Sequence, residues 1–340
     1  MTQANRWQDE YAISRTATIS TAATFGAASG EIGPDLNKFG MYLTDHPDID
    51  PGQAFIDKQK TAGISTRLGR KGASDTVVVE YRPGIRSPLV TFPFDVTPKQ
   101  IALPLWLLCQ ENVTEAAGTP FAKVYKPATT AAYETYCSVL RKTGNPSKSQ
   151  AIHGCVVSKI GFSTTEGEAL GATVDFIGRT YGELNMSAIA LAYPDSAPLL
   201  FQDCVVLLAG TTININGWTL DLSIDHKPKH HNAQTVVKFI AGMLTGSGTI
   251  DFPLSNATVG DSLQRDAFVA GTVQTLSLEW GTAGVEGHLK FEMNVRYSGA
   301  PISADDELVS ALPYEIVWDA PKAIDEAIVI TLSDAVDRGI

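Results

Sequence analysis

Apolar and polar residues alternate through most of the chain in short segments separated by turn residues, which is the pattern of β-strands. We therefore expect a mainly β protein. The segments predicted as strands are Thr76–Tyr81, Leu89–Phe94, Cys155–Phe162, Ala172–Ile177, Cys204–Leu208, Thr212–Ile215, Trp218–Ile224, Thr235–Ile240, Gly248–Phe252, Val273–Trp280, His288–Val295, Tyr314–Trp318 and Ile328–Leu332.

Helical periodicity is confined to a few places. The strongest pattern spans Pro98–Gln110, where a threonine precedes a first-turn proline and can cap the helix. Pro104 is expected to kink or interrupt this helix, because its ring removes a backbone donor. Weaker patterns predict helices over Thr130–Leu140 and Asp261–Phe268.

Three pairs of similar segments predict that the chain contains one β unit twice. The pairs are TVVVEYRPG (Thr76–Gly84) with TVVKFIAG (Thr235–Gly242), VTFPF (Val90–Phe94) with IDFPL (Ile250–Leu254), and the hairpins Gly154–Gly178 and Ala270–Val295. A chain of 340 residues also exceeds the size at which one core usually stops growing. We expect two tandem β domains, residues 1–200 and 201–340, with a short helix each.

Two stretches, residues 30–75 and 118–152, are rich in Gly, Pro, Asp and Lys and have little periodicity. They predict long connections. Ordered domains rarely carry such loops unless another surface orders them, so we expect contacts between subunits there. In particular, the loop from residue 35 to 72 is expected to reach a neighbouring subunit.

Charge changes the picture by excluding one class of function. The net charge is −11, whereas tight nucleic-acid binding needs clustered Lys and Arg. The excess is uneven, since 8 basic and 18 acidic residues follow position 200. This pattern favours a solvated surface that keeps the protein soluble.

Cysteine usage and hydropathy indicate a protein kept in cytosol-like solvent. The four cysteines, Cys109, Cys137, Cys155 and Cys204, show no CxxC spacing and are expected to be buried free thiols. The N-terminal sequence lacks the pattern of a signal peptide. The apolar runs fall short of the roughly 20 residues that cross a bilayer, so no membrane partner is expected.

Three groups of residues could carry chemistry, and none forms a convincing site. His153 and Cys155 lie two apart on a predicted strand and would share a face, yet no orienting group or oxyanion site accompanies them. The run of His226, Lys227, Pro228, Lys229, His230 and His231 carries lysines that repel a cation, which favours a solvated hairpin tip over a metal site. The glycines of RLGRKG, residues 67–72, lack the context of a phosphate loop.

No catalytic, cofactor-binding or metal-binding residue is therefore assigned, and the protein is not expected to be an enzyme. Arg67, Arg70 and Lys71 form the one compact basic patch of the sequence. Two interpretations of the patch stay open: a charged surface loop, or a contact with the acidic second half of a neighbouring subunit.

The order of several motifs resembles that of siphophage tail tube proteins in their tandem-domain variant. The motifs are LVTFPF, IALPLWLLCQENVTEA, HGCVVSKIGFSTTEGEALGATVDFIG, AYPDSAPLLFQDCVVLLAG, GWTLDLSIDH and GMLTGSGTIDFP, within residues 76–335. The resemblance implies a β-sandwich or half-barrel fold whose sheets join around an axis into stacked rings. Three tandem chains would make a ring of pseudo-sixfold symmetry, and hexameric rings stay open as an alternative.

The same resemblance implies a virion protein of the phage tail, assembled in the host cytoplasm, with no cofactor. Its implied partners are further copies of itself, the tape measure protein, and the tail terminator and distal tail proteins. Double-stranded DNA would pass through the lumen during genome ejection without specific binding. Glu166, Glu168 and Glu286, on predicted hairpins, are candidate lumen residues.

A virion adhesin or carbohydrate-binding β-sandwich is the main alternative, and an enzyme of unknown type is a second one. A sugar-binding module is expected to expose clustered aromatic rings. The tryptophans of this chain, Trp7, Trp106, Trp218, Trp280 and Trp318, are scattered instead, mostly within apolar patterns.

Overall fold

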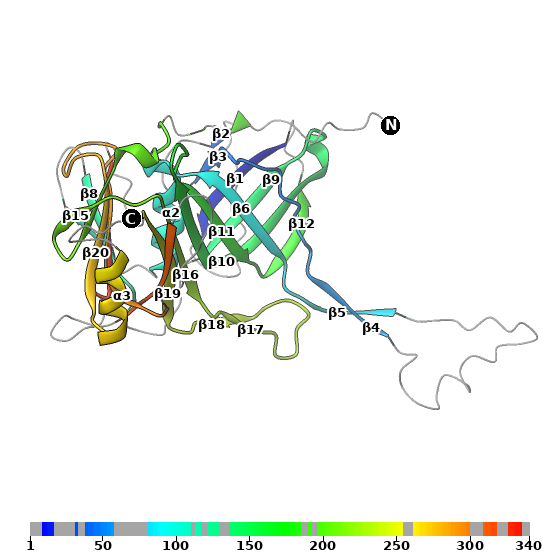
Figure 1. Ribbon diagram of the computed structural model, residues 1–340. Coiled ribbons are helices and arrows are strands. Elements are labelled where there is room, and N and C mark those ends of the chain that lie inside the picture. The colour runs from blue at the N-terminus through cyan, green and yellow to red at the C-terminus, as the bar shows by residue number, and fades with distance from the viewer. Residues whose placement is uncertain are drawn as a thin grey trace, which may run out of the picture.

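The computed structural model is mainly β, with large antiparallel sheets (Figure 1). It describes residues 9–16, 31–32, 38–57, 81–109, 113–116, 121–128, 136–184, 190–191, 193, 196–253, 261–299, 309–317 and 326–334. Within these ranges the first strands are β1 (Glu10–Thr16), β2 (Glu31–Ile32), β3 (Lys38–Met41), β4 (Gln53–Asp57), β5 (Tyr81–Arg86), β6 (Leu89–Asp95), β7 (Val113–Ala116), β8 (Phe121–Tyr125), β9 (Tyr136–Lys142), β10 (Ser149–Thr165), β11 (Gly171–Ile177), β12 (Thr180–Leu184) and β13 (Ala190–Leu191).

The later strands are β14 (Cys204–Leu208), β15 (Thr211–Ile213), β16 (Gly217–Ile224), β17 (Lys227–Lys229), β18 (Lys238–Ile240), β19 (Leu244–Pro253), β20 (Gln274–Trp280), β21 (Leu289–Tyr297), β22 (Val309–Ile316) and β23 (Ile328–Asp334). The helices are α2 (Pro98–Leu108) and α3 (Asp261–Ala270), and the 3₁₀ turns are η3 (Pro146–Lys148) and η4 (Phe201–Asp203).

Most strands predicted from alternation are confirmed: β6, β10, β11, β14, β16, β19, β20, β21 and β23 match the expected segments. The predicted strands at Thr212–Ile215 and Tyr314–Trp318 overlap β15 and β22 only in part. Of Thr235–Ile240, only the last three residues form a strand. The expected strand Thr76–Tyr81 lies outside the described residues except for Tyr81, which begins β5.

The helix predictions were right twice and wrong once. Helix α2 begins as expected, because the Thr97 hydroxyl accepts a hydrogen bond from the Gln100 N–H at 3.2 Å. Pro104 does not interrupt α2, whose residues are buried on nearly every side, so packing offsets the lost backbone bond. α3 confirms the third prediction. The helix predicted over Thr130–Leu140 is wrong from Tyr136 onward, where the chain forms β9.

The long connections expected over residues 30–75 and 118–152 contain several strands among their described residues. β3 and β4 lie in the first stretch, and β8, β9 and the start of β10 in the second. Both faces of β9 are buried over Tyr136–Leu140, so its residues lack the polar–apolar alternation that marks a half-exposed strand.

The structure forms a closed barrel whose strands come from both halves of the chain. β6 pairs with β11, β11 with β10, β10 with β9, β9 with β1, and β1 with β3. The chain after β3 then returns to β6, where the Thr44 N–H donates to the Pro93 carbonyl at 3.0 Å and Asp50 bridges to Leu89. A closed ring of strands leaves no free edge within itself.

The sheets of the two halves are continuous. β10 is 17 residues long and pairs through its first part with β9 and β12 and through its second part with β11 and β16. From β16 the sheet continues through β19 and β22 to β21. β23 lies between β21 and β8 of the first half and pairs with both strands. α2 packs against β10 and β23, so it lies in the core where the halves meet (Figure 1).

One order of elements occurs in both halves. In the first half, the segment around Asp50, which bridges Leu89, is followed by the two-stranded hairpin β4–β5, then β6, helix α2, three additional strands (β7, β8 and β9) and the hairpin β10–β11. In the second half, β16 is followed by the two-stranded hairpin β17–β18, then β19, helix α3 and the hairpin β20–β21. The segment at Asp50 bridges β6 in the antiparallel sense, and β16 likewise pairs antiparallel with β19.

Candidate assembly interface

The turns of the two long hairpins lie at one end of the molecule, here named the turn end. The Val96 N–H, next to the start of α2, donates to the Leu170 carbonyl in the β10–β11 turn at 2.7 Å. Lys99, in the first turn of α2, pairs with Glu286 of the β20–β21 turn at 3.2 Å. The start of α2 therefore holds both turns side by side.

The two small hairpins leave the opposite end, here named the arm end; we call β4–β5 the long arm and β17–β18 the short arm. β16 runs from Gly217, which pairs with Thr165 beside the β10–β11 turn, to Ile224, after which the short arm begins. The base of the long arm touches the loop of the short arm, because the Arg86 N–H donates to the Gln234 carbonyl at 2.7 Å. Figure 1 shows both arms projecting from the lower side of the molecule.

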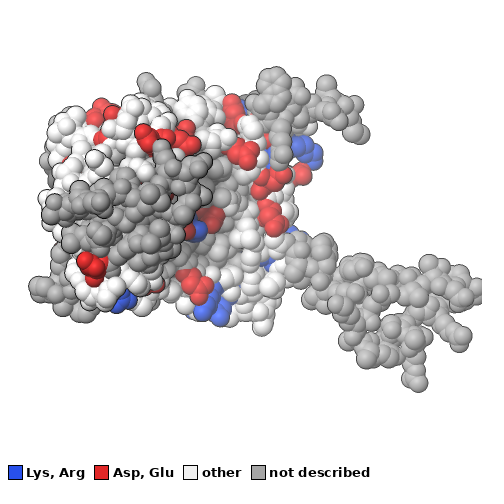
Figure 2. Space-filling view, in the orientation of Figure 1, with Lys and Arg blue, Asp and Glu red and all other residues white. Residues whose placement is uncertain are grey.

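Charge differs between the two ends. Glu166, Glu168 and Asp203 are exposed at the turn end, together with Glu286. In Figure 2, Asp and Glu are prominent along the upper edge, and both acidic and basic side chains lie near the lower edge, where Figure 1 places β17 and β18. The turn end therefore carries a group of exposed acidic side chains.

His153 and Cys155 do not share a face. A bulge at Gly154, whose φ is +63°, shifts the register of β10 against β9 between Ile152 and Cys155. The His153 ring contacts the Ser138 hydroxyl at 2.9 Å, while Cys155 lies opposite Cys137, the neighbour of Ser138 on β9. Adjacent strand residues point to opposite faces, so the imidazole cannot serve this thiol as a base.

Burial holds the thiols of Cys109, Cys155 and Cys204 in the protonated form. Cys109, Cys137 and Cys155 are buried and Cys204 is partly buried, and all four are free. Burial raises the pKa of Cys109 to about 12 and that of Cys204 to about 12, and it raises the pKa of Cys155 well above its ordinary value. Because the thiolate is the reactive form, these side chains are inert packing groups.

The predicted hairpin tip at residues 226–231 is the short arm and its turn. His226 lies at its base, where burial lowers the pKa of the imidazole to about 4 and Nε2–H donates to the Val157 carbonyl at 3.1 Å. The His230 ring contacts the Ser87 hydroxyl at 3.2 Å, and His231 is exposed. Across the described part of the chain, no group of three His, Cys, Asp or Glu side chains could hold a metal ion.

Some candidate residues cannot be placed. Arg67, Arg70, Lys71 and the whole RLGRKG segment lie outside the described residues, as does the loop from residue 35 to 72 beyond residue 57. Trp7 and Trp318 do so as well. The remaining tryptophans, Trp106, Trp218 and Trp280, are 2%, 1% and 0% exposed, so their rings offer no platform for stacking a sugar. The described helices include none long and apolar enough to cross a membrane.

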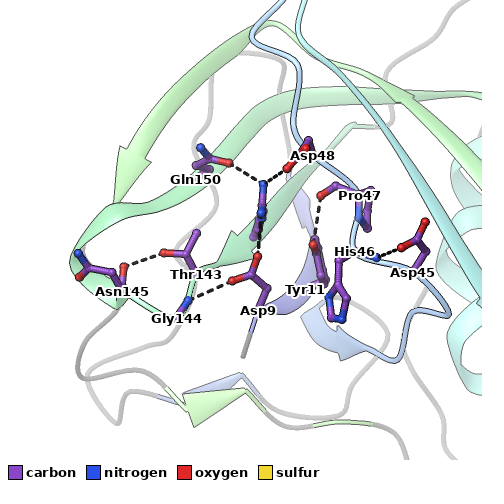
Figure 3. A network of polar contacts seen from close by, with 11 residues as sticks. Asp9, Tyr11, Asp45, His46, Pro47, Asp48, Thr143, Gly144, Asn145 and Gln150 are labelled. Carbon is purple, nitrogen blue, oxygen red and sulfur yellow. Dashed lines mark hydrogen bonds and ion pairs between the residues drawn. The ribbon is translucent and has the colours of Figure 1, made fainter. Parts of the chain in front are cut away.

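One polar cluster was missed by the sequence analysis (Figure 3). Arg141 on β9 binds Asp9 through Nε at 2.9 Å and Nη2 at 2.8 Å, and binds Asp48 through Nη1 at 2.7 Å. Asp9 also accepts from the Gly144 N–H at 3.0 Å. The cluster ties the beginning of β1 and the chain after β3 to β9. No local spacing could have revealed it, because its partners are 93 and 132 residues apart.

Comparison with known families agrees with a structural role. The family described as phage tail tube protein matches residues 17–320 of the chain. A search of curated proteins gave no match. Since the match covers most of the chain, and the fold is mainly β, this protein belongs to the phage tail tube family and is a structural protein of the virion tail that assembles into a tube.

Proposed function

We propose that the chain is the major tail tube subunit of a siphophage, with tandem tail-tube domains at residues 1–200 and 201–340. Three copies form a ring of pseudo-sixfold symmetry, and the stacked rings enclose the channel for DNA ejection. Closure of heterologous contacts makes a ring, and contacts that do not close extend it into a filament, so one subunit needs both kinds of surface.

The observation that carries the proposal is the matched orientation of the two halves. In each half, a small hairpin arm, a strand, a helix and a long hairpin follow in this order, and the first half has three additional strands (β7, β8 and β9) before its long hairpin. In each half the arm leaves at the arm end and the long hairpin turns at the turn end. A pseudo-sixfold ring of three chains requires two units in each chain that point in the same direction along the ring axis.

We name the sheet of β6, β11, β10, β16, β19 and β22 the central sheet, and its exposed face supplies a suitable channel wall. Side chains opposite each other in register share this face, and they are mostly hydroxyls, small residues and carboxylates. They are Thr91, Pro93, Lys159, Gly161, Ser163, Thr173, Asp175, Thr219, Asp221, Ser223, Thr245, Ser247, Thr249, Asp251, Pro313 and Glu315. The buried residues between them face the core.

Cations on this wall are paired with carboxylates. Lys159 lies 3.0 Å from Asp221, and Arg296 lies 3.9 Å from Glu315. DNA carries one negative charge per ~1.7 Å of duplex, so free cations would retard its passage. A hydroxyl-rich wall with paired cations lets DNA pass without specific binding. The earlier candidates Glu166, Glu168 and Glu286 lie at the turn end, so we propose them as mouth residues of each ring.

Partners and location follow from this role. The tape measure protein would fill the channel before DNA, and the tail terminator and distal tail proteins would bind the two ends of the tube. Assembly would take place in the host cytoplasm before the tail joins the virion. The long arm, whose strands β4 and β5 leave the body without pairing to it, would reach a neighbouring ring.

Negative-stain electron microscopy of the purified full chain tests the proposal, together with native mass spectrometry of the smallest assembly. We expect hollow tubes and a trimeric ring with six lobes in top view. A chain that stays monomeric at high concentration would contradict the tube, and a hexameric ring would contradict the tandem arrangement. Deleting residues 58–80, beyond the described strands of the long arm, should leave soluble rings that do not stack.

A further inference from the structure

The short arm displays a basic face. Lys227 pairs in register with Ile240, and Lys229 with Lys238, so these four side chains share one face of the hairpin, and all are exposed. The other face is apolar. Phe239 on that side is 5% exposed and packs edge-on against His226, with ring centroids 6.4 Å apart. The arm therefore rests on the body by one face and offers lysines on the other.

This arrangement is unfavourable in an isolated subunit. Like charges directly opposite each other on paired strands destabilise a hairpin, and Lys229 and Lys238 are such a pair. Asp225 lies 3.2 Å from Lys227 and offsets part of the charge. Ile240 and Met243 beside the lysines are 43% and 78% exposed. Exposed apolar side chains among clustered cations are the composition of a contact surface for an acidic partner.

A matching receptor lies at the turn end. A pocket of about 450 Å³ opens between the β10–β11 turn, η4 and the β14–β15 hairpin. Phe201, Val206 and Ile213 are among its lining residues, and Glu166 also lines it. Asp203 is exposed and stands between two lining residues. The pocket is within the range of specific binding sites, roughly 300–1,000 Å³, and its lining combines apolar side chains with amide groups and the carboxylate of Glu166.

We propose that the lysine face of the short arm docks into this pocket on a second copy of the chain in the next ring. The inference rests on the proposed function and adds the contact by which rings stack. The partner is a second copy because the arm and the pocket lie at opposite ends of one molecule and are complementary in charge. A head-to-tail contact of this kind repeats without closing and so builds a tube.

Charge reversal tests the contact in the full chain. K229E/K238E should abolish tubes, or raise the protein concentration needed for polymerisation about tenfold or more, while rings persist. E166K/D203K should have the same effect. Combining all four substitutions in one chain should restore tubes, because every contact then carries the reversed pair. Sedimentation and electron microscopy measure polymer and ring separately.

Matched controls separate the contact from general charge effects. K126E/K148E changes the net charge equally, at two solvent-accessible cations outside the short arm, the pocket and the channel wall, and should polymerise like the wild type. Circular dichroism melting confirms that each variant folds. Tubes formed unchanged by K229E/K238E, or no restoration in the combined variant, would overturn the proposal. A wild-type chain that forms no tubes would instead overturn the proposed function.

Discussion

Trp218 donates its indole N–H to the hydroxyl of Tyr314 at 2.8 Å, across the strand that separates them. The Tyr314 hydroxyl in turn donates to the Thr219 carbonyl at 2.8 Å. Both rings are buried. The pair thus links β16 to β22 across β19 within the central sheet. The single Tyr314 hydroxyl group therefore helps to hold these neighbouring strands together.

Replacing Tyr314 by Phe should lower the free energy of unfolding by about 1–3 kcal/mol, because the change leaves a buried indole donor without its acceptor. Urea denaturation followed by tryptophan fluorescence measures it. Tyr42→Phe is the control, since Tyr42 is 61% exposed and should change stability by about 0.5 kcal/mol or less. Equal effects of the two substitutions would contradict the role of the Trp218–Tyr314 bond.

Gly248 is the residue of β19 over which the Tyr314 ring lies. A Cβ at this position would meet the Thr219 carbonyl oxygen and would lie 2.6 Å from the Tyr314 hydroxyl. Gly248→Ala is therefore expected to cost about 3 kcal/mol of unfolding free energy and to lower the melting temperature. Gly182→Ala on β12, where a Cβ would meet nothing within 4 Å, should leave stability unchanged or slightly higher. Melting curves of the two variants that coincide would argue against this account.

Arg141 holds the N-terminal strand in the barrel. Arg141→Met removes the guanidinium from Asp9, whose side chain is 4% exposed, and leaves a buried carboxylate without its cation. We expect a loss of about 3 kcal/mol and faster hydrogen exchange in β1 than in β16. Lys148→Met breaks an exposed pair with Glu183 and serves as control, with an expected change within about 0.5 kcal/mol. Exchange in β1 that is as slow as in the wild type would refute the role of Arg141.

His226 should make stability depend on pH. Burial lowers the pKa of its imidazole to about 4 in the folded protein, whereas the unfolded value is near 6.5. Between these values the unfolded chain binds the extra proton, so stability is full above pH 6.5 and falls as the pH drops toward 4. The loss is on the order of 3 kcal/mol.

Urea denaturation at pH 7 and at pH 5 measures this slope. His226→Gln should lose less stability between the two pH values than the wild type does, while His231→Gln, at an exposed position, should keep the wild-type slope. Identical slopes for the His226 variant and the wild type would show that this imidazole is not the cause.

Sequence patterns predicted the half-exposed strands well, because one polar face produces the alternation; β14 and β16 are examples. They failed for β9, because both of its faces are buried and the alternation is lost. They also failed for the start of the predicted strand Thr235–Ile240. There Val236 is buried, and its carbonyl accepts a hydrogen bond from the Arg179 side chain. The His153–Cys155 prediction failed because alternation assumes an unbroken strand, and the bulge at Gly154 reverses it.

The assembly surfaces were only partly predictable. The hairpin tip at residues 226–231 and the acidic hairpin residue Glu166 were found as local sequence features. Their placement at opposite ends depends on strand direction and pairing, and the pocket depends on three segments that meet only in the fold. The lysine face of the short arm needed the register of β17 against β18, which the sequence does not display.

The ladders between the halves determine how the subunit carries mechanical load. A force that separates residues before and after position 200 must shear the β10–β16 ladder and the β8–β23 ladder together. Neither ladder can open as a hinge while the other stays paired, because strand pairing joins the two halves at both places. Bending of a tail would therefore be taken up where subunits meet, and each subunit would move as a stiff block.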